Sequence, residues 1–469
     1  MRRVIPLLLV AAMSLAGCAV GPDYERPELE LPADWRVEPE TAAQLANAAW
    51  WEQLGDPVLD ELIASALAEN LDMRIAAARV AQFGGALRAT RAGFMPQLGY
   101  GAGADRARSS EFLLPGGADP YSTQYRAALS ARWQLDLFGR VRRQSEAAQA
   151  RVYASEQGRR GVMVTTTASV AAGYVTLRAL DRQLEIAEAT TENYERTLEL
   201  FRLRHEQGVI SRLEVAQVES QYQQAAAAVP LLEGQIAAQE NLLSILMGRP
   251  PGPVPRGLAL AELDLPAVPA ALPAALLEQR PDVLQAEQDL VAANADVGAA
   301  RSLYFPDISL TGALGQVSNV LDELLDSAAR SWSVGGEVSG PIFTGGAIAG
   351  QVDVAEGVRE EALLRYRAAV LDALREVNDE LAGVSAARTN TAALARRAST
   401  LREYANLARM RFEAGAASYL DVLYADTELF AAELAEVSAR QAQYVNMVAL
   451  YRAMGGGWAA REPPDSGGM

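Results

Sequence analysis

The chain has 469 residues, a formal net charge of −17 and one cysteine. Every basic residue is an arginine, and with this acidic excess we expect no nucleic acid partner. One cysteine cannot form an intramolecular disulfide. Half of the residues are hydrophobic but only 6% are aromatic, which favours closely packed helices over a bulky globular core.

The N-terminus has the pattern of a secretory signal peptide, which we place at residues 1–17. Arg2 and Arg3 precede an apolar run that is too short to span a bilayer permanently. The end of this run, Leu15-Ala16-Gly17-Cys18, resembles a bacterial lipobox. We therefore expect Cys18 to be the lipid attachment site, carrying a diacylglycerol and an acyl chain such as palmitate. The alternative is an ordinary cleaved signal with an incidental cysteine.

Residues 18–56 follow as a stretch rich in proline and acidic residues with no sustained period. This composition predicts an extended, lipid-anchored periplasmic tether.

The rest of the chain contains one unit twice. Four landmarks recur 205–210 residues further along the chain: Pro96, Phe138, Gly208 and Met247-Gly248 reappear as Pro306, Phe343, Gly415 and Met454-Gly455. Such nearly constant offsets indicate a duplicated unit with small loop insertions. We assign the first repeat to 57–248, an equatorial linker to 249–280, the second repeat to 281–455 and a C-terminal tail to 456–469.

Each repeat begins with an amphipathic helix and continues with two segments in which apolar and polar residues alternate. These segments are predicted strands at about 96–106 and 122–138, and at about 306–317 and 331–343. One face is apolar and the other polar, which fits either a half-buried soluble sheet or a membrane barrel with a wet lumen. The flanking helices are far too long to pack beside these short hairpins, so no nearby amphipathic element is left to cover the apolar face. This favours the barrel.

Two very long helices follow the strands. They are predicted at 139–207 and 346–414, and at 1.5 Å per residue each would be about 100 Å long. Charges spread along the first of them exclude a membrane span. After a glycine, each is followed by a return helix, at 211–247 and 418–454, so each repeat ends in a helical hairpin.

Four strands cannot close a barrel, because the smallest known closed barrels have about eight and an unpaired edge in lipid is very costly. If the strands lie in lipid, the chain must oligomerise. A trimer would supply twelve strands to one barrel. Helices that continue its wall would form a long hollow cylinder, which is the shape of a conduit.

Several segments resemble those of the lipoprotein branch of TolC-like outer-membrane efflux factors, the NodT type. They are Cys18 to Tyr24, Trp50-Trp51 with Gly55-Asp56-Pro57, Arg280-Pro281-Asp282, Ala299 to Pro306, and Met454 to Trp458. The resemblance covers essentially the whole mature chain.

This resemblance implies an α+β, TolC-like fold with an internal two-fold repeat. Three chains would form a homotrimer with a twelve-stranded outer-membrane β-barrel, four strands per chain, continued by a long periplasmic α-helical barrel. It also implies a location in the outer membrane of a Gram-negative bacterium, in contact with outer membrane lipid.

The implied function is that of a passive exit duct for drugs or toxic compounds in a tripartite efflux pump. Its partners would be a periplasmic membrane-fusion adaptor and an inner-membrane RND-type transporter. A type I protein-secretion duct, a metal-efflux duct and a lipid-anchored coiled-coil scaffold without a pore stay open as alternatives. The sequence carries no motif of an enzyme. We expect no cofactor, apart from the lipid on Cys18, and no metal site.

In the resembled family, side chains just after the second hairpin turn narrow the periplasmic end. Leu420 falls on the apolar constriction, and we expect Leu420, Asp421 and Tyr424 to line this aperture. The alternative for Asp421 is a helix cap. Relatives commonly carry an Asp and an Arg at positions that here hold Tyr424 and Thr427, so their ionic latch is in doubt in this chain.

The free tips of the helical hairpins are the candidates for contact with the adaptor. They comprise Val209, Ile210, Ser211, Ala416, Ala417 and Ser418. Plain solvated turns are the alternative. His205, the chain's one histidine, lies just before the first tip and is expected to be a surface residue without a metal.

Overall fold

The computed structural model describes residues 20–28, 32, 49–110, 112, 115–116, 119–266, 268 and 280–456. The predicted signal peptide, Cys18, most of the predicted tether and nearly all of the predicted tail lie outside these residues. Two compact units are present. Unit 1 comprises the described parts of 1–28, 79–155 and 286–366, and unit 2 comprises the remainder. Each unit therefore contains segments of both repeats.

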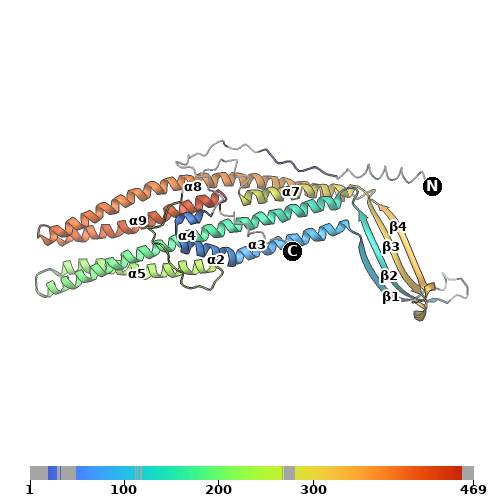
Figure 1. Cartoon of the computed structure of the whole chain (residues 1–469), viewed down its shortest axis with the longest axis horizontal. Coiled ribbons are helices and arrows are strands. Elements are labelled where there is room, and N and C mark those ends of the chain that lie inside the picture. The colour runs from blue at the N-terminus through green and yellow to red at the C-terminus, as the bar shows by residue number, and fades with distance from the viewer. Residues whose placement is uncertain are drawn as a thin grey trace. The chain divides into compact units, whose positions relative to one another are not determined.

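Both repeats end in a long helix and a shorter return helix, but their other helices differ (Figure 1). η1 (Trp50–Leu54) precedes the first repeat, whose helices are α2 (Pro57–Glu69), α3 (Leu71–Arg91), η2 (Ala92–Phe94), α4 (Arg140–Glu206) and α5 (Arg212–Leu246). In the second they are α7 (Pro281–Arg301), η5 (Ser302–Tyr304), η6 (Leu321–Glu323), η7 (Ser327–Ala329), α8 (Ala347–Glu413) and α9 (Tyr419–Ala453). Both α4 and α8 have 67 residues, and both α5 and α9 have 35.

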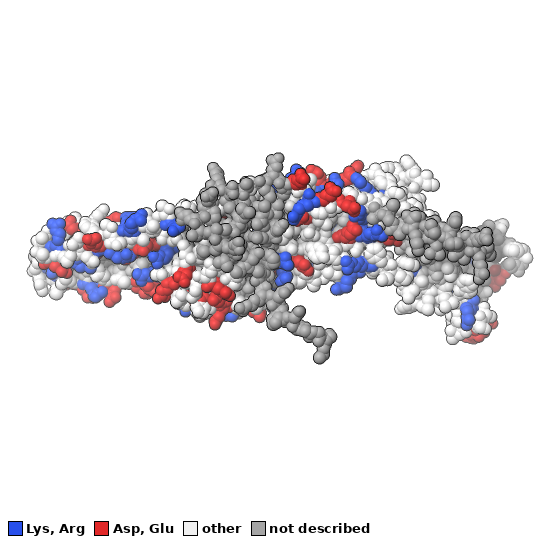
Figure 2. All heavy atoms as spheres, turned by 45° about the horizontal axis from the view of Figure 1, so that its top comes forward, with Lys and Arg blue, Asp and Glu red and all other residues white. Residues whose placement is uncertain are grey.

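Charged side chains of both signs are interspersed over the helical part of the molecule (Figure 2). Many form pairs one helical turn apart, such as Arg182 with Glu185 at 2.8 Å on α4. Among the residues that the structure describes, no helix combines the length and the apolar character needed to cross a membrane.

Small side chains bring the helices together. In unit 1, α4 and α7 meet through a cluster made only of alanines: Ala147, Ala150, Ala292 and Ala295. In unit 2, α4 and α5 pack against each other through the buried residues Leu198, Phe201, Val215 and Val218. The α8–α9 hairpin closes on Ala405, Ala408, Val422 and Ala425. The alanine-rich, aromatic-poor composition thus reflects close approach of helix backbones.

Four antiparallel strands form one sheet in unit 1. They are β1 (Gln97–Arg108), β2 (Tyr121–Leu135), β3 (Asp307–Ser318) and β4 (Arg330–Ser339), and they lie side by side in this order. The central pairing, β2 with β3, joins the two repeats. Within the described residues, the outer edges of β1 and β4 have no partner strand.

The register separates an apolar face from a polar face. One row across all four strands consists of Tyr100, Leu129, Leu314 and Trp332. These side chains are 90%, 63%, 55% and 74% exposed. A row on the opposite face consists of Gln97, Arg132, Thr311 and Gly335. The apolar face is therefore uncovered in the single chain, and such a patch normally marks an interaction surface.

Two strands end earlier than the alternation predicts, and local chemistry explains both ends. We expect the second strand to run to 138, but β2 ends at Leu135 because Asp136 begins the turn into α4. Its carboxylate accepts hydrogen bonds from the amides of Val141 and Arg142 at 2.9 and 2.8 Å. We expect the fourth strand to run to 343, but β4 ends at Ser339. Pro341, two residues on, has no amide hydrogen to donate to a neighbouring strand.

The first turn of α2 contains a carboxylate with one buried oxygen that has no hydrogen-bond partner among the described residues. The carboxylate is that of the partly buried Asp60, and the oxygen is its Oδ1. Burial raises the pKa of Asp60, and the nearby carboxylates of Glu52 and Asp56 raise it further. A raised pKa in the folded state means that folding favours the protonated carboxyl. This contribution to stability is complete at low pH and is lost as the pH rises through the folded-state pKa.

We therefore expect Asp60→Asn to raise the temperature of thermal unfolding at neutral pH, because the amide cannot ionise. The advantage should shrink as the pH falls through the raised pKa of Asp60, because the wild-type carboxyl then becomes protonated. Circular dichroism during heating measures both. Asp72→Asn, in the exposed first turn of α3, is the matched control. Equal effects of the two substitutions at neutral pH would contradict the prediction.

Candidate channel site

Both helical hairpins turn at a glycine with a left-handed backbone. Gly208 and Gly415 have φ of 73° and 72°, a region that favours glycine because it has no Cβ. The amide of Val209 donates to the carbonyl of Arg204 at 2.9 Å, and Ala416 donates to Arg411 at 2.8 Å. The last carbonyls of α4 and α8 are thereby satisfied in the same way in both repeats.

A capping box begins each return helix. The amide of Ser211 donates to the carboxylate of Glu214 at 2.7 Å, and this hydrogen bond lowers the pKa of Glu214. In the second repeat, the amide and the hydroxyl of Ser418 both donate to Asp421 at 3.1 Å. Asp421 therefore caps α9, which is the alternative that the sequence leaves open for it.

The other two predicted aperture residues are exposed on the first turns of α9. Leu420 is 56% exposed and Tyr424 is 61% exposed. Tyr419, between the cap and Leu420, points the other way. Its ring lies 4.3 Å from Phe201 and 5.3 Å from Phe412, centroid to centroid. Tyr419 is not among the residues predicted from the sequence, because its contacts depend on how the hairpins pack.

Tyr419 belongs to a contact that joins the two hairpins of unit 2. Tyr194 of α4 and Ala225 of α5 form one buried cluster with Leu423 of α9, and Tyr419 packs against it. Burial raises the pKa of Tyr419 to about 12. Close by, Thr427 donates to the side chain of Gln221 at 3.2 Å. The two hairpins therefore pack as one bundle near their tips.

The remaining tip residues have ordinary surroundings. Val209 of the first tip is exposed. His205 Nδ1 lies 3.0 Å from the carbonyl oxygen of Ile210 and so takes part in closing the turn. Among the described residues, no group of His, Cys, Asp and Glu side chains is arranged to hold a metal ion.

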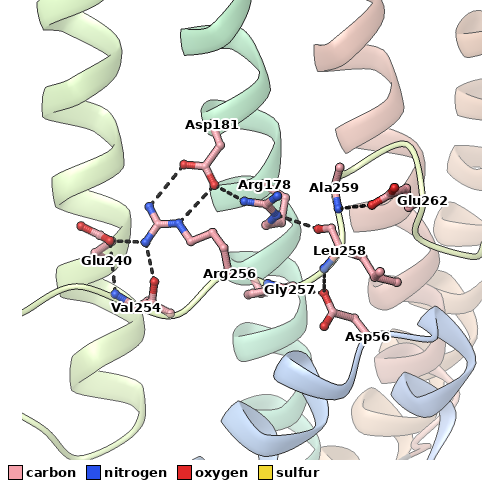
Figure 3. Close-up of polar contacts among 11 residues, drawn as sticks. Asp56, Arg178, Asp181, Glu240, Val254, Arg256, Gly257, Leu258, Ala259 and Glu262 are labelled. Atoms are coloured by element: carbon pink, nitrogen blue, oxygen red, sulfur yellow. Dashed lines mark hydrogen bonds and ion pairs between the residues drawn. The ribbon is translucent and has the colours of Figure 1, made fainter.

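A second group of polar residues lies around Asp56 in unit 2 (Figure 3). The carboxylate of Asp56 is fully buried. It accepts hydrogen bonds from the Val58 amide at 2.9 Å, the Tyr174 hydroxyl at 2.7 Å and the Leu258 amide at 2.9 Å. The Tyr174 oxygen in turn accepts from the amide of Gly257 at 2.8 Å. A Cβ at position 257 would lie 2.1 Å from Asp56 Oδ1, so the site requires glycine.

Two arginines extend this network to the neighbouring helices (Figure 3). Arg256 contacts Asp181 of α4 at 3.2 Å and also pairs with Glu240 of α5. Arg178 donates to the carbonyl of Leu258 at 2.8 Å and to Asp181 at 2.5 Å. The segment that follows α5 is thus tied to both helices of the first hairpin.

Arg280, from the Arg-Pro-Asp segment, has a related role in the second repeat. Its buried guanidinium donates to the carbonyl of Ala453 at 2.7 Å and pairs with Asp282 and Glu376 at 2.6 and 2.9 Å. The positive charge therefore sits at the C-terminus of α9, where the helix dipole favours it.

The segment just after Cys18 is held firmly within unit 1. The amide of Val20 donates to the carbonyl of Phe138 at 3.2 Å, and Arg143 donates to the carbonyls of Val20 and Gly21 at 3.2 and 3.3 Å. Gly21 has φ of 107° and passes so close to α7 that a Cβ would lie 2.4 Å from the Cα of Gly298. Only glycine fits this crossing.

Further along, the carboxylate of Glu287 on α7 accepts hydrogen bonds from the Tyr24 hydroxyl at 3.1 Å and from Nε and Nη2 of Arg26 at 2.7 and 2.5 Å. This bidentate pair fixes the chain direction. The segment from Val20 to Arg26 therefore lies along α4 and α7, and we call it the strap.

A chain with two repeats, two glycine-turned helical hairpins and four strands with one uncovered apolar face has the architecture of an outer-membrane channel subunit. The profile of the outer membrane efflux protein family matches residues 62–249 and 272–456, once for each repeat. The chain belongs to the outer membrane efflux protein family.

Characterised relatives align over nearly the full length. The chain is 35% identical over 466 residues to the solvent efflux pump outer membrane protein SrpC of Pseudomonas putida, covering 97% of this chain and 99% of the relative. It is 32% identical over 454 residues to the cation efflux system protein CusC of Escherichia coli, covering 95% and 97%.

Solved structures agree. The open state of the MtrE outer membrane channel of Neisseria gonorrhoeae matches with a TM-score of 0.86 at 30% identity. The match covers 94% of this chain and 99% of the MtrE chain. The predicted membership of the TolC-like outer-membrane efflux family, the fold with its internal repeat and the outer-membrane location are thereby confirmed, whereas the lipoprotein branch stays a prediction.

The Asp56 network generates a stability prediction. Asp56→Ala should lower the free energy of unfolding by about 3 kcal/mol, because it removes the acceptor of three hydrogen bonds, including the one from the buried Tyr174 hydroxyl. Tyr174→Phe should cost about 1–2 kcal/mol, since it strands the Gly257 amide. Thermal unfolding followed by circular dichroism measures both. The control is Tyr153→Phe, which alters an exposed tyrosine of α4. If Asp56→Ala shifts the transition no more than this control, the network does not stabilise the fold.

Proposed function

We propose that this chain is the outer-membrane channel subunit of a tripartite efflux pump and acts as a passive exit duct for drugs or other toxic compounds. The observation that carries the proposal is the uncovered, two-faced sheet. In lipid, every backbone amide and carbonyl must be paired within protein. A sheet with two free edges meets this requirement only when its edges pair with other strands.

The strand order indicates how the edges pair. Neighbouring strands are antiparallel throughout, so β1 and β4 run in opposite directions. The β4 edge of one chain can therefore pair antiparallel with the β1 edge of the next. Three chains would close a barrel of twelve strands, within the range of outer-membrane barrels. The apolar row through Tyr100 and Trp332 would then face lipid.

The polar face would line the lumen, and its side chains suit a wide passage. Two adjacent rows contain only small residues: Gly99, Ser130, Ala313 and Ser333, then Gly101, Ala128, Gly315 and Ser331. No bulky group of these rows projects into the interior. A scaffold without a pore would need neither this face nor the apolar one.

The names of the relatives support the transport role. They include pumps named for solvents and toluene and a system named for cations. We infer an efflux duct that works with a periplasmic adaptor and an inner-membrane transporter, with the transporter selecting the compound.

We place the periplasmic aperture at the first turns of α9. Leu420 and Tyr424 are exposed there, and Asp421 lies between them in the cap. In a trimer, three copies of Leu420 would form an apolar ring. The adaptor would contact the adjacent tips, Val209 to Ser211 and Ala416 to Ser418.

We also propose that Cys18 carries the lipid. The strap from Val20 to Arg26 begins two residues after Cys18, and Val20 is bonded to Phe138, between β2 and α4. This would hold the acyl chains where the strands pass into helices. Such a position suits a lipid anchored in the periplasmic leaflet.

Replacing Leu420 by Ala should increase single-channel conductance in planar bilayers several-fold, because it shortens the side chain at the narrowest point. Leu213, at the equivalent position of the first repeat, is 67% exposed on α5. Leu213→Ala is thus a matched control that should leave conductance unchanged. Equal conductance of the Leu420 variant and the wild type would remove the aperture assignment. A detergent-extracted protein that is monomeric and does not conduct would overturn the channel itself.

Cys18→Ser should abolish lipid attachment. The mass of the purified wild type should exceed that of the chain beginning at residue 18 by one diacylglycerol and one acyl group. The variant should lack this increment in whole-protein mass spectrometry. A wild-type mass without acyl groups would contradict the assignment and favour an ordinary cleaved signal peptide.

A further inference from the structure

Charged residues are sorted between the two faces of the sheet. All three acidic residues of the strands, Asp105, Asp307 and Glu337, lie on the polar face by the register. The apolar face carries no acidic residue within the four strands, but it carries three arginines. These are Arg106 and Arg108 on β1 and Arg330 on β4.

The three arginines lie toward one end of the sheet but not in one row, since Arg330 is level with Ala102, four and six residues before Arg106 and Arg108. Arg108 is the last residue of β1 and Arg330 the first of β4. The helices join the strands at the opposite ends, because α3 leads into β1 and α4 follows β2. If the helices are periplasmic, the arginines lie at the extracellular boundary of the membrane.

A shallow groove of about 550 Å³ lies beside them on the sheet. Ala102 and Ala127 are paired across β1 and β2, and their small side chains leave space between larger neighbours. Its main apolar walls are Tyr100, Leu129 and Leu314, and Arg330 lines it as well. The groove therefore offers an apolar surface for a hydrocarbon chain over β1 and β2, and Gln316 and Arg330 give it a polar end over β3 and β4.

The arginines present their guanidinium groups on this face. Arg106 and Arg108 lie 5.6 and 5.8 Å from the ring centroid of Tyr121, so the tyrosine orients them. Arg330 is exposed, and it forms no ion pair with the described residues, which include Asp322, Glu323 and Asp326 of the preceding loop. A planar guanidinium matches a phosphate through paired hydrogen bonds.

We propose that this surface binds a phosphorylated glycolipid of the lipid A type from the extracellular leaflet. One acyl chain would occupy the groove between Ala102 and Ala127, and the phosphates would contact Arg330 and the Arg106–Arg108 pair. This proposal rests on the proposed function for its orientation in the membrane. In the closed trimer, Arg330 of one chain would also lie near β1 of the next, so that phosphates could bridge subunits.

The full-length protein in detergent is titrated with bis-phosphorylated lipid A, with the same lipid after removal of its phosphates, and with phosphatidylglycerol. Bound lipid is counted by native mass spectrometry. The wild type should bind phosphorylated lipid A at least about tenfold more tightly than either other lipid, roughly 1.4 kcal/mol. The triple variant Arg106→Gln, Arg108→Gln, Arg330→Gln should lose this preference.

The matched control removes two arginines from the other face of the same sheet, Arg126→Gln and Arg132→Gln. It should bind as the wild type does. A second variant, Ala127→Leu, fills the groove without changing charge and should weaken binding of the phosphorylated lipid severalfold. It tests the acyl chain site independently of the arginines.

Three results would overturn the inference: unchanged binding by the triple variant, an equal loss in the control, or equal affinity for phosphatidylglycerol. The last two would mean general attraction between charges. The groove and all three arginines lie in one chain, so binding can be read from a monomer. Retained binding by a protein that neither trimerises nor conducts would overturn the proposed function and support this inference.

Discussion

The pairing of backbone hydrogen-bonding groups at the edges of the sheet governs the rest of this structure. Water can satisfy a free strand edge, but hydrocarbon cannot. The chain pairs β2 with β3 internally and leaves β1 and β4 at the two edges with opposite directions. In the proposed barrel, those edges would meet strands from other copies, the apolar row through Leu129 and Leu314 would face lipid, and the small residues of the polar face would line the lumen.

The long helices must stay in register without a core of bulky side chains. Alanine clusters allow close approach, but they provide little specificity. Directed polar contacts supply it: Asp56 fixes the loop at Gly257 by hydrogen bonds, and Arg280 fixes the end of α9. Near the tips, Tyr419 joins one hairpin to the other. Further polar contacts between helices, such as Gln183 with Ser438 and Gln441 with Thr176, lie along the hairpins as well.

Much of this architecture can be predicted because periodicity depends on the chain alone. The alternation of Leu129 and Ala131 with Ser130 and Arg132 gives the two faces of a strand, and the recurrence of Gly208 as Gly415 gives the repeat. The early end of β2 depends on the reach of the Asp136 side chain, which no period encodes. Likewise, the capping role of Asp421 and the inward packing of the partly buried Tyr419 ring depend on side-chain direction. That Arg330 lies on the apolar face, like Arg106 and Arg108, can be seen only when the register between the strands is known.

The pairing of β2 with β3 across the repeats has an evolutionary consequence. A half-length ancestor with a single hairpin would have needed six identical copies to supply the same number of strands. In the proposed trimer, a chain with two hairpins needs only half that number of copies, and its two halves can differ in sequence. The capping boxes already differ, with Glu214 in one and Asp421 in the other. The proposed aperture at α9 would use this difference, since α5 at the equivalent place would form only wall.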